Sequence, residues 1–204
     1  MISKDFDSRQ AKRRIVVGVS GASGAIYAVH LVKALANAGI EVHFVATKAG
    51  WEVLEYECGM TRERLTKYVH VIYDVNQIGS AIASGSFRCE AMAVVPCSMK
   101  TLGSLAGGIC DNLLTRAADV TLKEGRRLVI VPRETPVHAI HLENMLRLAH
   151  AGARILPACP GFYHRPKTID ELAGMMAGKI CDALGVENDL FERWQGPPEA
   201  IQKV

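Results

Sequence analysis

The sequence has little of what marks several protein classes. Its six cysteines form no C-x-x-C pair, so they fit neither a zinc site nor a secreted disulfide framework. No apolar run approaches the length of a membrane span, and the polar residues 1–14 do not resemble a signal peptide. The formal charge of +3 is too small to indicate a nucleic-acid partner. We therefore expect a cytoplasmic protein with reduced thiols and neither membrane nor nucleic-acid contacts.

The chain also lacks repeats, low-complexity stretches and an interdomain linker. Its 204 residues, 49% of them hydrophobic, suit a single domain with a sizeable core. We expect one domain over residues 1–204, with a loose arm at 1–14 and an irregular tail at 195–204.

Short β-branched runs alternate with amphipathic segments, which is typical of βαβ units. The pattern predicts an α/β, doubly wound, mostly parallel sheet with a Rossmann-like fold. We expect Pro96 and Pro132 to end strands and Thr135-Pro136 to begin a helix. The predicted strands are 15–19, 41–47, 91–95, 128–131 and 154–156, and the helices are 25–37, 113–123, 135–150 and 168–184.

Ligands of such sheets bind at the carboxyl ends of the strands. Four loops follow predicted strands there, and all are rich in hydroxyls, glycines or charge. We expect them to form one pocket from residues 20–24, 47–50, 96–101 and 132–136.

The first of these turns, Gly18 to Gly24, is a glycine loop that leads into a helix. Free N–H groups and the helix dipole favour an anion there. The glycines do not have the G-x-G-x-x-G spacing, and the second strand ends in Thr47 rather than an acid, so a mononucleotide is favoured over NAD. A tight turn that merely needs small residues explains this segment alone about as well.

Two further strand ends carry reactive side chains. Cys97 could be a nucleophile, but no histidine lies nearby in sequence and a packing role is favoured. Arg133 and Glu134 suit phosphate recognition and proton transfer, although a structural salt bridge is nearly as good an interpretation.

The segment from Arg116 to Lys123 places charges along one side of a helix. An exposed charged stripe is the ordinary interpretation, but Ala117-Ala118 suggest close packing to another surface, such as a subunit interface. His138 and His141 have no carboxylate in a ligand-like spacing, so we expect no metal site.

Together these segments resemble the UbiX-like flavin prenyltransferases, the small subunits of phenolic and other aromatic-acid decarboxylase systems. The resemblance covers residues 15–194 and depends on the order of several short motifs. These are GVSGASG at 18–24, ASGSF at 83–87, PCSMKTL at 96–102, RAADV at 116–120, LKE at 122–124, RETP at 133–136 and FYHRP at 162–166.

The resemblance implies that a dimethylallyl group from dimethylallyl phosphate is joined to N5 and C6 of reduced FMN without a metal. The prenylated FMN would serve a UbiD-like decarboxylase, and the enzyme would be a homododecamer. The FMN-binding residues would be Gly21, Ala22, Ser23, Thr47, Ser98, Met99, Lys100, Thr101 and Arg133. The dimethylallyl-phosphate residues would be Ser84, Arg116, Lys123, Glu134, Tyr163, Lys179 and Trp194, some from neighbouring subunits.

Within that set, the resemblance implies chemical roles for Ser23, Lys123, Glu134 and Tyr163. Cations would receive the phosphate charge, Glu134 or the released phosphate would act as base, and Ser23 would relay a proton beside N5. Two positions depart from many relatives: Lys179 replaces an arginine, and Ile78 stands where some have a tryptophan. The sequence does not distinguish a monophosphate from a diphosphate donor.

Two alternatives belong to other classes. An FMN-dependent cysteine decarboxylase shares the architecture, but its histidine after the second strand and its Pro-x-Met-Asn segment are missing. A flavin-binding partner subunit without catalysis is compatible with the glycine turn, yet it has no evident use for Lys123, Glu134 and Tyr163.

Overall fold

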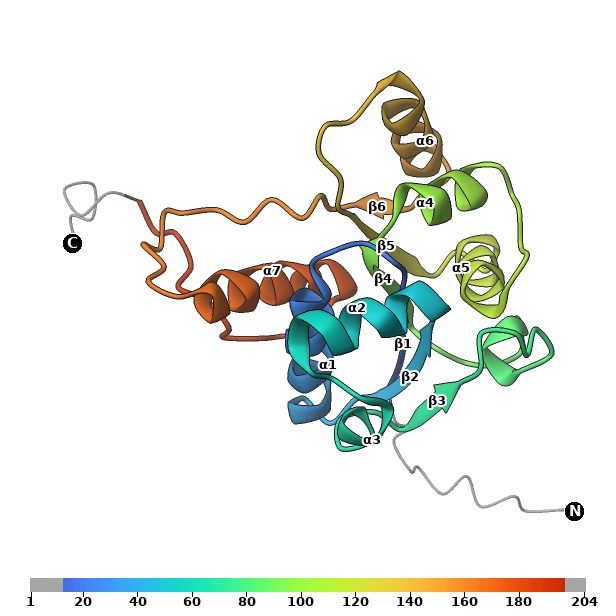
Figure 1. Cartoon of the computed structure of the whole chain (residues 1–204), viewed down its shortest axis with the longest axis horizontal. Coiled ribbons are helices and arrows are strands. Elements are labelled where there is room, and N and C mark those ends of the chain that lie inside the picture. The colour runs from blue at the N-terminus through green and yellow to red at the C-terminus, as the bar shows by residue number, and fades with distance from the viewer. Residues whose placement is uncertain (1–12, 197–204) are drawn as a thin grey trace, which may run out of the picture.

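The computed structural model describes residues 13–196 (Figure 1). Residues 1–12 of the predicted arm (1–14) and residues 197–204 of the predicted tail (195–204) lie outside that range. The fold is built on one sheet in the order β3-β2-β1-β4-β5-β6, and every pair of neighbouring strands is parallel. The predicted doubly wound fold is confirmed. The strands are β1 (Arg14–Val19), β2 (Glu41–Ala46), β3 (Val71–Tyr73), β4 (Ala91–Cys97), β5 (Arg127–Pro132) and β6 (Arg154–Ile155).

Helices cover both faces of the sheet, because the central strands are apolar on both sides. On β1, Ile15 and Val17 belong to one core cluster and Val16 to the other. The first cluster packs under α1 (Ala25–Asn37), α2 (Lys48–Cys58) and α7 (Ile169–Leu184). The second packs under α4 (Met99–Ala106), α5 (Leu113–Lys123) and α6 (Ala139–His150). Short turns of helix, α3 (Arg62–Leu65) and η1 (Ala81–Ala83), flank β3.

Several predicted boundaries were wrong. Pro96 lies inside β4 rather than ending the strand, at a register irregularity where its missing N–H breaks no regular ladder. Pro132 is the last residue of β5 and pairs with Cys97. The helix predicted from Thr135 begins only at Ala139, because His138 still has extended backbone (φ −116°, ψ 173°). Arg14 belongs to β1 rather than to an arm.

Elements were also missed, namely α2, α3, β3, η1 and α4. Two of them change the site. Thr47 does not end β2 but caps α2 by accepting a hydrogen bond from the Gly50 amide at 3.0 Å. Ser98 caps α4 in the same way through Thr101. The predicted loop 47–50 is therefore the start of a helix, and the predicted loop 96–101 is the end of β4 followed by the start of α4.

Candidate active site

The turn after β1 and the start of α4 are joined through the buried side chain of Ser20. Its Oγ donates to the Pro96 carbonyl at 3.1 Å and accepts from the Ser98 amide at 2.7 Å. Ser20 is only 1% exposed. This contact holds the carboxyl ends of β1 and β4 together where the strand order reverses, the usual ligand position in such sheets.

A cleft of about 660 Å³ opens beside this junction at the carboxyl edge of the sheet. Three helices begin at its wall, and each has a capping residue there: Thr47 for α2, Ser98 for α4 and Asn112 for α5. Lys48 and Lys100 add positive charge, while Glu52 and Asp111 add negative charge. Converging helix N-termini favour an anion. Of the predicted FMN residues, the cleft brings together Gly21, Thr47, Ser98, Lys100 and Thr101; Asn76, Ser104, Asp111, Asn112 and Thr115 were not foreseen.

Gly21 is required where the first turn meets the start of α2. A Cβ on Gly21 would lie within 2.4 Å of the Ala49 Cβ, closer than real contacts allow. The glycine thus permits close approach of two backbone segments beside the cleft. Ala22, in contrast, is buried, and its amide donates to the Ser20 carbonyl at 2.9 Å.

The N-terminus of α1 is already satisfied by a carboxylate of this chain. Glu57 Oε2 accepts from the amides of both Gly24 and Ala25 at 2.9 Å. The prediction that the amides of this turn are free was therefore wrong for Ala22, Gly24 and Ala25. Glu57 was missed because it lies in α2, 33 residues from Gly24 along the chain.

Arg133 connects the end of β5 to the same turn. Its Nε donates to the Ser23 carbonyl at 2.9 Å. Glu134 is exposed beside it and accepts from the amide of Thr135 at 3.0 Å, so the two predicted partners do not form a salt bridge with each other in the described interactions. Burial, with a contribution from Cys159, raises the pKa of the neighbouring Tyr27. Arg133 thus brings the end of β5, where Glu134 follows it, to the backbone of Ser23.

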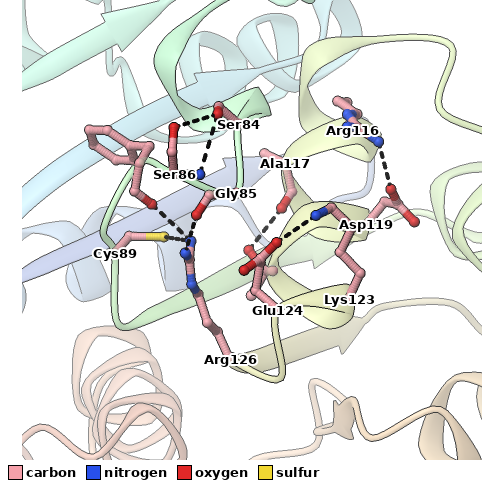
Figure 2. A network of polar contacts seen from close by, with 12 residues as sticks. Ser84, Gly85, Ser86, Cys89, Arg116, Ala117, Asp119, Lys123, Glu124 and Arg126 are labelled. Carbon is pink, nitrogen blue, oxygen red and sulfur yellow. Dashed lines mark hydrogen bonds and ion pairs between the residues drawn. The ribbon is translucent and has the colours of Figure 1, made fainter.

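Two predicted phosphate-binding residues, Ser84 and Lys123, lie toward the opposite, amino-terminal edge of the sheet. Figure 2 shows them with Arg116, which lies in the first turn of α5, close to the start of that helix at the cleft. Ser84 lies in the segment that leads into β4, and Lys123 lies in the one that leads into β5. Lys123 pairs with Glu124 at 2.5 Å, and Arg116 pairs with Asp119 at 2.9 Å. Ala117 and Ala118 pack closely, as predicted, but against this chain's own core rather than against a neighbouring subunit.

The predicted substrate residues Tyr163, Lys179 and Trp194 lie on or near α7. Tyr163 and Trp194 meet edge to face with ring centroids 6.0 Å apart, and they line a hollow of about 530 Å³ with Arg165 and Arg193. Lys179 is exposed on α7. Since α7 and α5 cover opposite faces of the sheet, one chain does not bring Lys123 and Tyr163 together.

Other candidate residues have structural roles. Cys97 is fully buried, and burial raises the pKa of its thiol far above the usual range, in agreement with the packing interpretation. His138 and His141 stack at 3.6 Å between ring centroids.

Residues 13–196 contain no group of His, Cys, Asp and Glu side chains placed to hold a metal ion. Within the same range, no helix has the length and apolar character to cross a membrane. Met99 packs partly against the core, and Ile78 is 45% exposed after β3.

Comparison with known proteins shows the family and agrees with the fold. Residues 4–182 match the family model described as Flavoprotein. The chain is 47% identical to the flavin prenyltransferase UbiX of Methanothermobacter thermautotrophicus, over 90% of this chain and 96% of that protein. A crystal structure of AnUbiX (PadA1) with FMN and dimethylallyl pyrophosphate superimposes with a TM-score of 0.89, at 41% identity and over 91% and 98% of the two chains.

A dodecameric FMN-dependent UbiX-like decarboxylase from Escherichia coli O157:H7 is 40% identical, with a TM-score of 0.87 over 90% of this chain and all of that one. The cysteine decarboxylase TvaF reaches only 21% identity and a TM-score of 0.58, over 70% of this chain and 88% of that one. The similarity to TvaF shows only that the two proteins share a fold.

Proposed function

The chain belongs to the flavoprotein family, among its UbiX-type flavin prenyltransferases, and we propose that it transfers a dimethylallyl group from dimethylallyl phosphate to reduced FMN. The observation that carries this proposal is the cleft at the carboxyl edge of β1 and β4. There, three helix N-termini and two lysines meet beside a glycine turn. A dianionic phosphate ester with a polar chain fits such a site.

The residues of the cleft fit FMN chemically. The amides that open α2 and α4, with Lys48 and Lys100, would receive the phosphate. Ser98 Oγ and Thr101 Oγ1, which lie 3.2 Å apart, offer hydroxyls to the ribityl chain. The bare backbone at Gly21 allows the flavin to approach the turn. Reduced FMN would supply the nucleophilic N5 and C6 atoms.

The flavin ring would then extend toward Ser23, Arg133 and Glu134. The Ser23 hydroxyl would hold or pass a proton at N5, and its backbone is fixed by Arg133. Glu134, whose carboxylate already contacts a backbone amide, would take a proton from the flavin as the new bonds form. The guanidinium of Arg133 would balance the charge of this carboxylate.

The dimethylallyl phosphate would be held between copies of the chain. Arg116 and Lys123 carry positive charge on α5, which covers one face of the sheet, whereas Lys179 on α7 and the Tyr163–Trp194 pair belong to the other side. A neighbouring subunit in a dodecamer would bring the two groups together, as the assembly of the similar Escherichia coli protein suggests. The cations would stabilise the leaving phosphate.

We further propose that a UbiD-like decarboxylase receives the product. The support is chemical: a modified flavin is useful only to an enzyme that binds it, and the family resemblance indicates that recipient. We also propose a cytoplasmic location.

The proposed activity can be tested by anaerobic incubation of the protein with reduced FMN and either dimethylallyl phosphate or dimethylallyl diphosphate. Mass spectrometry of the released flavin should show a gain of one C5H8 unit with at least one donor, and none with oxidised FMN. FMN binding without a mass change with either donor would overturn the proposal.

A further inference from the structure

The segment that carries Ser84 is tied to the start of β5 by one arginine (Figure 2). Arg126 donates from Nη2 to the Gly85 carbonyl at 2.6 Å and from Nη1 to the Phe87 carbonyl at 2.9 Å. Nη1 also lies 3.4 Å from Cys89 Sγ. A single guanidinium therefore contacts both ends and the middle of the segment 85–89.

Ser84 is rigidly coupled to the atoms that Arg126 holds. Its Oγ lies 2.8 Å from Ser86 Oγ and accepts from the Ser86 amide at 3.3 Å. The Phe87 amide donates to the Ser84 carbonyl at 3.1 Å. Displacement of the Gly85 and Phe87 carbonyls would consequently displace the Ser84 hydroxyl.

The same segment passes directly beside Lys123. A Cβ on Gly85 would lie 3.2 Å from Lys123 Nζ and closer still to the Glu124 carboxylate. A side chain at residue 85 would therefore displace the Glu124 carboxylate from its place beside Lys123. The relative position of Ser84 and Lys123 is thus determined where this backbone crosses α5.

Arg126 is itself anchored to the helix that carries Lys123. Its amide donates to the Thr121 carbonyl on α5 at 2.9 Å, and Arg127 after it begins β5. Its guanidinium therefore links a fixed point of α5 to the segment of Ser84. Phe87 adds a second attachment by packing edge to face on His43, with ring centroids 4.9 Å apart.

We propose that Arg126 is a positioning residue, which sets the distance between the Ser84 hydroxyl and the Lys123 ammonium for recognition of the dimethylallyl phosphate group. This inference rests on the proposed function. Arg126 acts through its carbonyl contacts and does not touch the substrate. The planar guanidinium can satisfy two carbonyls at once, whereas a lysine can replace only part of this geometry.

The test compares Arg126→Ala and Arg126→Lys with the unaltered protein in the prenylation assay. The KM for dimethylallyl phosphate should rise about tenfold in Arg126→Ala, because charge-assisted hydrogen bonds are lost, and by a smaller factor in Arg126→Lys. The Kd for FMN should not change, since its cleft lies at the other edge of the sheet, and kcat should change less than KM.

Arg127→Ala is the matched control. Arg127 is the adjacent residue and also donates to a carbonyl, that of Leu184 at 3.3 Å, but not to the Ser84 segment. The Arg127→Ala substitution should leave the KM for dimethylallyl phosphate unchanged. An unchanged KM for dimethylallyl phosphate in Arg126→Ala would overturn the inference. So would an equal loss of affinity for FMN and for dimethylallyl phosphate in Arg126→Ala, if Arg126→Lys restored neither affinity. Failure of the unaltered protein to prenylate FMN would instead refute the proposed function.

Discussion

The carboxylate of Glu57 accepts a hydrogen bond from the amide of Gly24, so the end of one helix caps the beginning of another. Gly24 is the N-cap of α1 and has φ +106°, and it has no capping side chain of its own. Glu57 supplies the missing acceptor from the last turn of α2 and also binds the Ala25 amide. The glycine turn at the predicted flavin site is therefore supported by an anion of the chain.

Replacement of Glu57 by alanine should lower the free energy of unfolding by about 1–2 kcal/mol, because two amides and the α1 dipole lose their acceptor. Urea denaturation measures this change. FMN affinity should fall as well, since the turn loses its support. Glu55→Ala, on the exposed side of the same helix, is the control and should remain within about 0.5 kcal/mol of the unaltered protein. Equal effects of the two substitutions would contradict this role of Glu57.

Replacement of Ser20 by alanine should destabilise the protein by about 1–3 kcal/mol, because the partly buried Ser98 amide would lose its acceptor. The start of α4 should shift, and FMN should bind more weakly. Denaturation and a flavin titration report the two effects separately. Ser80→Ala serves as a control, since the Ser80 side chain makes no capping hydrogen bond. A Ser20→Ala protein of full stability and affinity would show that the junction is dispensable.

Replacement of Glu134 by glutamine should leave FMN binding intact and slow prenylation about 100-fold or more, as expected when a general base is removed. The shape of the side chain is retained, and its position is exposed, so the fold should be unaffected. Single-turnover measurement with preformed reduced flavin isolates the chemical step. Glu63→Gln on the exposed surface of α3 should have no effect. Unchanged turnover in Glu134→Gln would remove this residue from the mechanism.

His43 should make stability depend on pH. Burial, together with His70 and Arg14, lowers the pKa of His43 from 6.5 to about 4. The unfolded chain then binds a proton near pH 6.5 that the folded protein binds only near pH 4. The stabilisation that this pKa difference gives the folded protein is complete above pH 6.5 and is lost as the pH falls toward 4. The free energy of unfolding should fall by about 1.36 kcal/mol per pH unit, up to about 3 kcal/mol in all.

Urea denaturation between pH 7 and pH 4.5 measures this slope. It should become shallower in His43→Gln, whatever the absolute stability of that variant, and should persist in His150→Gln, which changes an exposed histidine on α6. Identical slopes in His43→Gln and the unaltered protein would assign the pH dependence to other groups.

Sequence patterns predicted the sheet and the helix 25–37 well, because the apolar residues of each strand and of this helix repeat regularly. They did not predict α2, in which charged residues interrupt the apolar ones and only Gly50 and Leu54 are buried. Since α2 was missed, its capping residue Thr47 was interpreted as a strand end and Glu57 was overlooked. Contacts between residues far apart in sequence, such as Glu57 with Gly24, leave no local pattern.

The predicted site residues were chosen by motif, and motifs do not specify where a residue lies relative to the sheet. Whether a residue precedes or follows a strand does indicate at which edge of the sheet it lies. Ser84 and Lys123 each precede a strand, which places them at the amino edge, whereas Gly21 and Arg133 follow strands and lie at the carboxyl edge. The separation of the two groups could therefore have been inferred from the predicted strands.

The placement of Lys123 and Tyr163 on opposite sides of the chain has a genetic consequence. If each active site combines the two from different subunits, a Lys123→Ala protein and a Tyr163→Phe protein would each be impaired in every site. Mixed assemblies of the two would regain about a quarter of their sites, those in which each subunit supplies its unaltered half. Two defective alleles in one cell would then complement each other, although neither encodes a working enzyme.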